Sequence, residues 1–310
     1  MKKLRIIALL LLLIICLAQI PLSAQSSDTQ KPKELLSALG YLSQGSGRWT
    51  TIAQNAAGDT PDDAQAREIK KAVESNLKNG YTKATDIAYD IISASSCGYD
   101  VNTIGEKSPV ALLSGYEGML SQGANGPIYS LLALDSSGYE TPENAVWDRQ
   151  SLCDAILSFQ TPEGGFRLTE TMDADVDITA YALTALSRYA DEDGMSPAID
   201  RAVTWLMSRQ NADATFSSLG VSASESTASV VMALVSLGIP VSGQRFTQDG
   251  VSVYDALLGF QNPDGGFSHE QGGKSNLLAT EQAVMAMGTV CFGKSPFLLA
   301  SVSPPSDIAN

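Results

Sequence analysis

The sequence predicts an all-α protein built from six helical hairpins, and three observations lead to this fold class. A pair of short motifs recurs three times in the second half of the chain. Amphipathic stretches alternate with stretches that are apolar or small on every side. No stretch shows the two-residue alternation that marks a half-buried β-strand. Six such hairpins can close into an α6/α6 toroid, which we expect, or stack as an open array of repeats.

The repeat is clearest where a glutamine precedes a phenylalanine by six residues. The first copy reads SFQTPEGGF and the third GFQNPDGGF, with a weaker SRQNADATF between them. Their glutamines are Gln160, Gln210 and Gln261. A second motif follows each copy at similar spacing: Asp177-Ile178-Thr179-Ala180, Glu225-Ser226-Thr227-Ala228 and Ala279-Thr280-Glu281-Gln282. Two motifs in phase over three copies indicate a structural repeat.

Each repeat predicts a half-exposed outer helix followed by an enclosed inner helix. Before the second glutamine, Ile199, Val203 and Leu206 fall on one helical stripe. The stretch 178–189 is instead apolar or small nearly all round, which is typical of a helix enclosed on every side. The alternation extends backward through outer stretches 34–44, 63–78 and 109–121 and inner stretches 49–57, 85–95 and 127–135. The total is twelve predicted helices.

The N-terminal segment has the three-part pattern of a secretory signal. Three basic residues precede the apolar run 6–15, and small residues at 22–24 offer a cleavage site. An uncleaved anchor is the alternative, and no other apolar run is long enough to span a bilayer. We therefore expect a secreted or cell-surface protein with no stable membrane span after signal cleavage. The expected parts are a signal peptide (1–24), a linker (25–33), the toroid (34–292) and a Pro/Ser-rich tail (293–310).

Composition excludes several classes of function. With 34 acidic and 20 basic residues the net charge is −14, which disfavours nucleic acid or anionic lipid as a partner. His269 is the single histidine, so a multi-histidine metal site is excluded and no metal is expected. Beyond the signal segment, Cys97, Cys153 and Cys291 have no metal-binding spacing. They could form one disulfide at most, and we expect small buried side chains.

The glutamine motif followed by a Thr-Ala inner helix resembles the prenyltransferase/squalene-cyclase repeat. The likeness covers 34–292 and is strongest over 122–288, although this chain has Phe where cyclases usually have Trp. The segment 122–129 (QGANGPIY) is more specifically similar to bacterial secreted prenyltransferase-repeat proteins. This resemblance implies the closed α6/α6 toroid that such proteins share with the N-terminal domain of transcobalamin and intrinsic factor.

In such a toroid the inner helices are parallel, so their N-termini line one mouth. Acidic residues lie at or near three of these N-termini. Each acid could simply cap its helix, or the acids and nearby polar groups could form a ligand-binding rim. The candidate ligand-binding residues are Asn125, Tyr129, Asp175, Asp177, Thr179, Tyr181, Glu225, Ser226, Thr227, Thr280, Glu281 and Gln282.

The resemblance favours a non-catalytic module that binds a small molecule at this mouth, with a corrinoid (cobalamin-like) ligand as a candidate. Such a module requires no cofactor. A polar rim covers only one side of so large a ligand, so a partner chain or a small β domain supplied in trans would have to close the site. The first alternative class is a surface domain that recognises a protein or a polysaccharide.

The second alternative is an enzyme. The segment 175–180 (DVDITA) resembles the D-x-D-D-T-A motif of class II terpene cyclases, whose middle acid protonates an alkene or epoxide. By that alignment Asp177 is the acid and Asp175 its neighbour, whereas Ile178 replaces the third acid. Aromatic residues make up only 7% of the chain, and Trp49 is the one tryptophan that begins an inner stretch. We therefore expect no catalysis.

Overall fold

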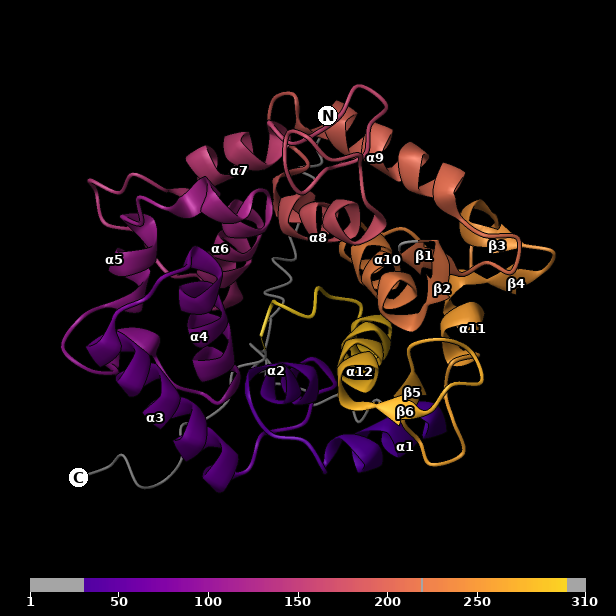
Figure 1. Cartoon of the computed structure of the whole chain (residues 1–310), viewed down its shortest axis with the longest axis horizontal. Coiled ribbons are helices and arrows are strands. Elements are labelled where there is room, and N and C mark those ends of the chain that lie inside the picture. Colours follow the sequence, from indigo (N-terminus) through magenta and orange to yellow (C-terminus); the bar gives the residue numbers. More distant parts are fainter. Residues whose placement is uncertain (1–30, 219, 300–310) are drawn as a thin grey trace, which may run out of the picture. The chain divides into compact units, whose positions relative to one another are not determined.

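A computed structural model describes residues 31–218 and 220–299, and its inner helices close into a ring (Figure 1). The inner helices are α2 (Arg48–Ala56), α4 (Ala84–Ser96), α6 (Asn125–Ser136), α8 (Val176–Leu186), α10 (Ser224–Ser236) and α12 (Leu277–Phe292). Each packs against the next, and α12 packs against α2. The α6/α6 toroid is therefore confirmed, and the open array is not what forms.

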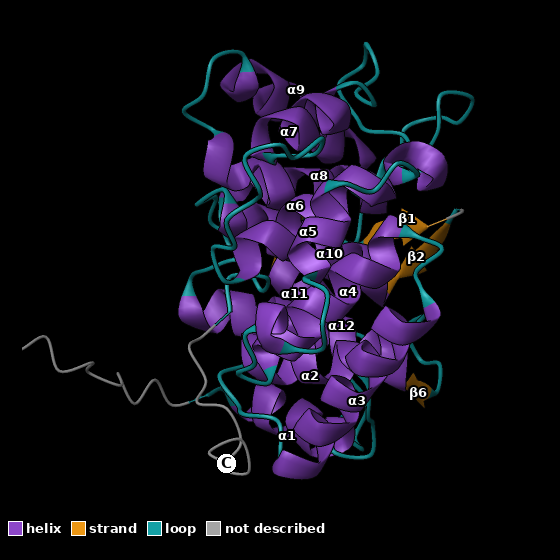
Figure 2. Cartoon of the chain, turned by 90° about the vertical axis from the view of Figure 1, so that its left-hand side faces the viewer, coloured by secondary structure: helices purple, strands orange, loops and turns teal. Residues whose placement is uncertain are grey.

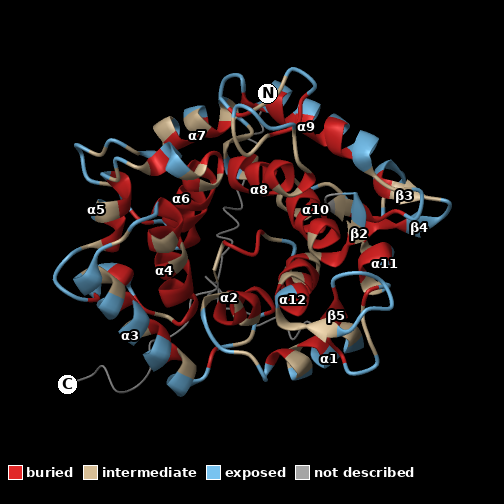
Figure 3. Cartoon of the chain, in the orientation of Figure 1, coloured by how far each residue is buried: buried red, intermediate tan, exposed pale blue. Residues whose placement is uncertain are grey.

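The outer layer surrounds this ring (Figure 1), and the side view in Figure 2 shows that the described chain is almost entirely helical. Its helices are α1 (Lys33–Leu42), α3 (Asp63–Asn79), α5 (Pro109–Ser114), α7 (Arg149–Leu157), α9 (Met195–Arg209) and α11 (Val253–Leu258). Four short 3₁₀ turns, Val101–Thr103, Met119–Gln122, Ser187–Tyr189 and Gln244–Phe246, lie between helices. The inner helices are buried almost throughout, whereas the outer helices expose one face (Figure 3). This difference in burial matches the two kinds of hydrophobic pattern in the sequence.

Three short antiparallel ribbons depart from the expectation that the chain has no strands. The strands are β1 (Phe216–Ser218), β2 (Val221–Ala223), β3 (Thr247–Gln248), β4 (Val251–Ser252), β5 (Phe267–Ser268) and β6 (Ser275–Asn276). They pair in order, β1 with β2, β3 with β4 and β5 with β6. Strands of two or three residues are too short to show an alternating pattern in a sequence, so the prediction missed them.

Hydrogen bonds explain why the two repeated motifs keep a similar spacing in all three copies. The repeated phenylalanines Phe166, Phe216 and Phe267 are fully buried. Their backbone N–H groups donate to the hydroxyl oxygens of Thr179 (2.8 Å), Thr227 (3.0 Å) and Thr280 (2.9 Å). A buried backbone N–H needs such a partner, so each loop is fixed to the inner helix that follows it.

The repeated glutamines join one repeat to the next. The Gln160 amide donates to the Gly164 carbonyl in its own loop and to the Ala198 carbonyl in α9. Gln210 bonds in the same way to Ala214 and Phe246, and Gln261 to Gly265 and Glu34. Glu34 lies in α1, so the last copy of the motif connects the final repeat to the first helix of the ring.

Glycine in the same loop allows the next outer helix to approach. A Cβ atom on Gly266 would lie 2.8 Å from the Tyr41 ring and 2.6 Å from the Ser275 Cβ atom. Real Cβ atoms do not come so close to other atoms, so only glycine fits between the loop and this neighbouring helix. Gly165 has the equivalent position against Trp205 in the earlier repeat.

Two segments of the chain lie before the first helix and after the last helix of the ring. The predicted signal peptide, most of the linker and residues 300–310 lie outside the described residues, so signal cleavage and export remain predictions. After α12 the chain turns back, and Phe297 is buried inside the ring. Within the described residues Cys97, Cys153 and Cys291 are unpaired, and no helix is both long and apolar enough to cross a membrane.

Candidate functional site

The first turns of α8, α10 and α12 bring the predicted acids to one mouth of the ring. Asp175 is the N-cap of α8, because its side chain accepts the backbone N–H groups of Asp177 (2.9 Å) and Ile178 (3.0 Å). Glu225 and Glu281 are not caps, since the capping positions of α10 and α12 are Ala223 and Asn276. Helix capping therefore explains one acid and leaves the others free for another role.

Asp177 is partly buried between α8 and α10. The Ser229 hydroxyl donates to its carboxylate at 3.2 Å. Burial, and then the negative charge of Asp175, raises the pKa of Asp177 from 3.8 to about 6, although the hydroxyls of Ser226 and Ser229 partly offset this rise. This carboxyl group therefore keeps its proton under mildly acidic conditions, in which an exposed aspartate would be ionised.

A histidine–carboxylate pair lies next to this acid. The His269 Nδ1 atom is 2.8 Å from Glu225 Oε2, and the Ser224 hydroxyl donates to the same oxygen at 3.1 Å. His269 is about half exposed, as expected for a loop residue, whereas Glu225 is largely covered. The negative charge of Glu225 also contributes to the raised pKa of Asp177. The single histidine thus belongs to the acidic mouth, which the sequence pattern did not indicate.

Glu281, the acid on α12, faces α2. Glu281 is buried, and it accepts a 2.6 Å hydrogen bond from the Thr50 hydroxyl. Burial raises the pKa of its carboxyl group. The adjacent Gln282 accepts a hydrogen bond from the Tyr181 hydroxyl at 3.3 Å. Contacts between α8 and α12 and between α12 and α2 thus connect polar side chains from different parts of the ring.

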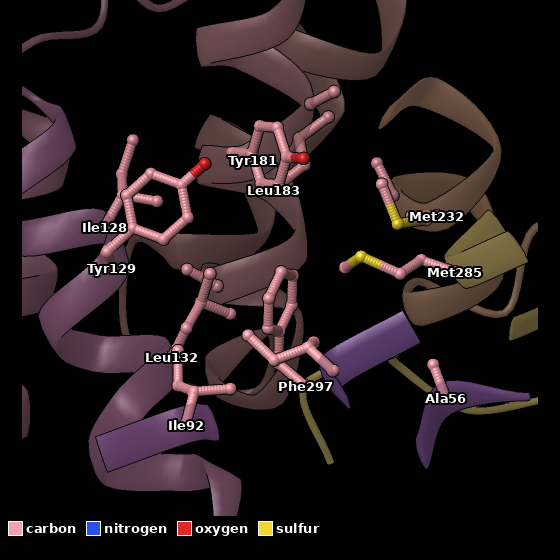
Figure 4. Packing of buried hydrophobic residues seen from close by; sticks show 14 of the residues in the cluster. Ala56, Ile92, Ile128, Tyr129, Leu132, Tyr181, Leu183, Met232, Met285 and Phe297 are labelled. Carbon is pink, nitrogen blue, oxygen red and sulfur yellow. The ribbon is translucent and has the colours of Figure 1, made fainter. Parts of the chain in front are cut away.

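An aromatic row lines the inner face below the mouth. Trp49, Tyr89, Tyr129 and Tyr181 come from α2, α4, α6 and α8, with centroids of successive rings 5.2, 4.9 and 5.5 Å apart. Phe297 extends the row, 6.3 Å from Tyr181. Figure 4 shows Phe297 beneath Tyr181, with Leu132 on one side and Met285 on the other. The aromatic faces of the row can stabilise positive charge.

This row was missed when aromatics were counted over the whole chain. The useful signal is positional, because Tyr89, Tyr129 and Tyr181 each lie in the second turn of consecutive inner helices. Corresponding positions in successive repeats fall side by side around a ring. A low aromatic fraction is therefore compatible with a well-defined aromatic wall.

The remaining predicted site residues take different places. Asn125 is the partly buried first residue of α6, and Ser226 is buried in the first turn of α10. The hydroxyls of Thr179, Thr227 and Thr280 bond to the loops before their helices. Among the described residues, no group of three or more His, Cys, Asp or Glu side chains is placed to hold a metal ion.

The fold and sequence together assign the chain to a family. The model of the prenyltransferase alpha-alpha toroid domain matches residues 124–247 and 230–295, together more than half of the chain. The chain therefore belongs to the prenyltransferase alpha-alpha toroid family. A comparison with curated proteins gave no significant match.

A solved structure with the same fold is the ent-copalyl diphosphate synthase from Streptomyces platensis. The two match with a TM-score of 0.53 and 19% sequence identity, over 82% of this chain and 50% of the synthase. The chain thus spans about half the length of that protein. At this level of identity the match shows a terpenoid cyclase-like toroid.

These comparisons correct the main functional prediction. A non-catalytic module that binds a small molecule was expected, but the structural relative is a terpene cyclase. The findings therefore agree with the alternative of a class II terpene cyclase-like enzyme, and the prediction of a binding module was wrong. The reasons given against catalysis were the incomplete acid motif and the scarcity of aromatics, and the second does not hold for this ring interior.

Proposed function

We propose that the protein is a class II terpene cyclase-like enzyme, in which Asp177 protonates a double bond or epoxide of an apolar isoprenoid chain. The observation that carries the proposal is the position of Asp177. Its carboxyl group, with a pKa raised to about 6, lies at the mouth of a ring in which four neighbouring inner helices carry a row of aromatic side chains. Acid and aromatic wall together are what a proton-initiated cyclisation needs.

The first step is the transfer of a proton from the Asp177 carboxyl group to the substrate. Burial and the charge of Asp175 disfavour the ionised form, so Asp177 is still partly protonated near pH 6, where it can supply a proton to a bound substrate. The π electrons of the substrate form the new C–H bond, which leaves a carbocation on the neighbouring carbon and a carboxylate on Asp177. The Ser229 hydroxyl and the N-terminus of α8 then stabilise this carboxylate. Water at the mouth accepts a proton from the cyclised cation, and Asp177 takes a proton back from solvent, which completes the cycle.

The aromatic wall accounts for the next step. A carbocation formed near Asp177 faces Tyr181 and Tyr129, whose rings are 5.5 Å apart. Both tyrosines are largely buried, which limits the water able to capture the cation. A polar rim covers only one side of a large ligand, so a partner chain or a small β domain is proposed to cover the outer side of the mouth.

Product analysis tests the proposal. The purified protein would be incubated with squalene and with a linear prenyl diphosphate at pH 5.5 and 7.5, and products would be analysed by gas chromatography–mass spectrometry. Cyclised products are expected from the native protein and none from Asp177→Asn.

Asp148→Asn is the matched control, because Asp148 is an exposed cap on α7. Its neighbour Arg149 contacts the C-terminal end of α6, which places this control at the opposite end of the ring. Activity should survive this substitution. Failure of the native protein to convert either substrate, or conversion by Asp177→Asn at an unchanged rate, would show that Asp177 is not the initiating acid.

A further inference from the structure

The segment that follows α12 lies across the ring at the end opposite the acids. The backbone N–H of Leu299 donates to the carbonyl of Ser136, the last residue of α6, at 3.2 Å. The Leu298 N–H donates to the Ser295 carbonyl at 3.1 Å and folds the segment into a turn. In Figure 1 this stretch crosses the middle of the ring.

Phe297 is the side chain that this turn places inside the ring. It is 1% exposed, and it lies against Leu132 of α6 and Tyr181 of α8. The space left between the segment and helices α6 and α8 is about 10 Å³, room for one water molecule at most. At this end of the ring the segment therefore packs tightly against α6 and α8.

We propose that Phe297 is the floor of the substrate site and determines how far an apolar chain can enter the ring. This inference rests on the proposed function, since it identifies a specificity-determining residue of the same site. Tyr181 lies one helical turn below Asp177 on α8, and Phe297 packs against Tyr181 from the opposite end of the ring. An apolar chain that enters the ring past Asp177 and Tyr181 therefore meets Phe297.

The depth of the site follows from helix geometry. Thr184, which faces the same small space as Phe297, is seven residues beyond Asp177 on α8. At about 1.5 Å per residue the floor lies no more than about 10 Å below the acid, which is roughly two isoprene units. A longer chain must leave its remaining units at the mouth, where water or a partner chain covers them.

Chain-length preference tests this floor. Geraniol, farnesol and geranylgeraniol share a hydroxyl group and lengthen by one isoprene unit at a time. Their binding would be measured by thermal shift and calorimetry on full-length protein carrying Asp177→Asn. Because that background removes the proposed acid, the result shows whether Phe297 limits binding depth even if the chain proves to have no cyclase activity.

In this background, Phe297→Ala and Phe297→Leu are expected to raise the affinity for farnesol and geranylgeraniol by on the order of tenfold, because one further unit becomes buried. The affinity for geraniol should stay nearly constant. The leucine variant keeps most of the packing, so it carries the test if the alanine variant does not fold.

Phe246→Leu is the control, since Phe246 is equally buried but pairs with Phe216 rather than with the aromatic row. It should lower the melting temperature without changing the order of affinities. Equal gains in affinity for all three alcohols would mean that every ligand must displace Phe297 to bind, and would overturn the proposal. Unchanged affinities in both Phe297 variants would overturn it as well.

Discussion

Replacing Asp177 with asparagine is expected to stabilise the protein at neutral pH. The pKa of this carboxyl group is 3.8 in the unfolded reference and about 6 in the folded chain. The folded protein thus binds the proton more tightly than the unfolded chain does. The stability that the protonated carboxyl contributes is fully present below pH 3.8 and is lost as the pH rises through 6. Above pH 6 the ionised group lowers the free energy of unfolding.

The size of the effect follows from the shift. Each pKa unit corresponds to about 1.4 kcal/mol, so a shift of about two units makes ionised Asp177 cost about 3 kcal/mol at pH 7. Asparagine is neutral and nearly the same size, and it can still accept the hydrogen bond from Ser229. The variant should therefore gain up to about 3 kcal/mol at pH 7 and close to nothing at pH 4.

Urea unfolding of both proteins at pH 4, 5, 6 and 7 measures this difference. The gap between Asp177→Asn and the native protein should open between pH 4 and pH 6. Asp148→Asn, at an exposed helix cap, should show no such gain at neutral pH, because hydrogen bonds from Ser151 lower the pKa of Asp148 and favour its ionised form. An Asp177→Asn variant that is less stable than the native protein at pH 7 would refute the assignment of Asp177 as a buried acid with a raised pKa. A difference in the free energy of unfolding that is the same at every pH would refute it as well.

Three further outcomes test the packing of the ring. Gly266→Ala should lower the free energy of unfolding by about 1–3 kcal/mol in urea titrations, because the new methyl group meets the Tyr41 ring. Gln261→Ala removes both hydrogen bonds at the joint between the last repeat and α1 and should cost about 1–3 kcal/mol, similar to Gln160→Ala in the same assay. Burial raises the pKa of the Cys97 and Cys153 thiols to about 12, so neither should react with iodoacetamide at pH 8 until urea unfolds the protein, as read by mass spectrometry.

The two-layer fold could be predicted because its cause is local in the sequence. A stripe of apolar residues, such as the one through Ile199 and Val203, requires one buried face. A helix such as α8, apolar all round, requires cover on every side. The closed ring was harder to predict, because its closure depends on residues far apart in the sequence, such as Gln261 with Glu34 and Thr50 with Glu281.

The candidate site was only partly predictable for the same reason. The acids stood out because they begin recognisable helices, and the structure brings Asp177 and Glu225 together at one mouth. Their different roles depend on neighbours from other repeats, such as His269 beside Glu225 and Thr50 beside Glu281. The place of Phe297 could not be predicted, since nothing in a Pro/Ser-rich tail indicates that it turns back into the ring.

The bond between Gln261 and α1 also limits how this protein can change in length. An open stack of repeats gains or loses a unit at either end with little effect on the others. Here every inner helix already has two inner neighbours, so a seventh hairpin would have to separate α12 from α2 and break that bond. Changes in length are therefore expected in the connecting loops, because an added hairpin would open the ring.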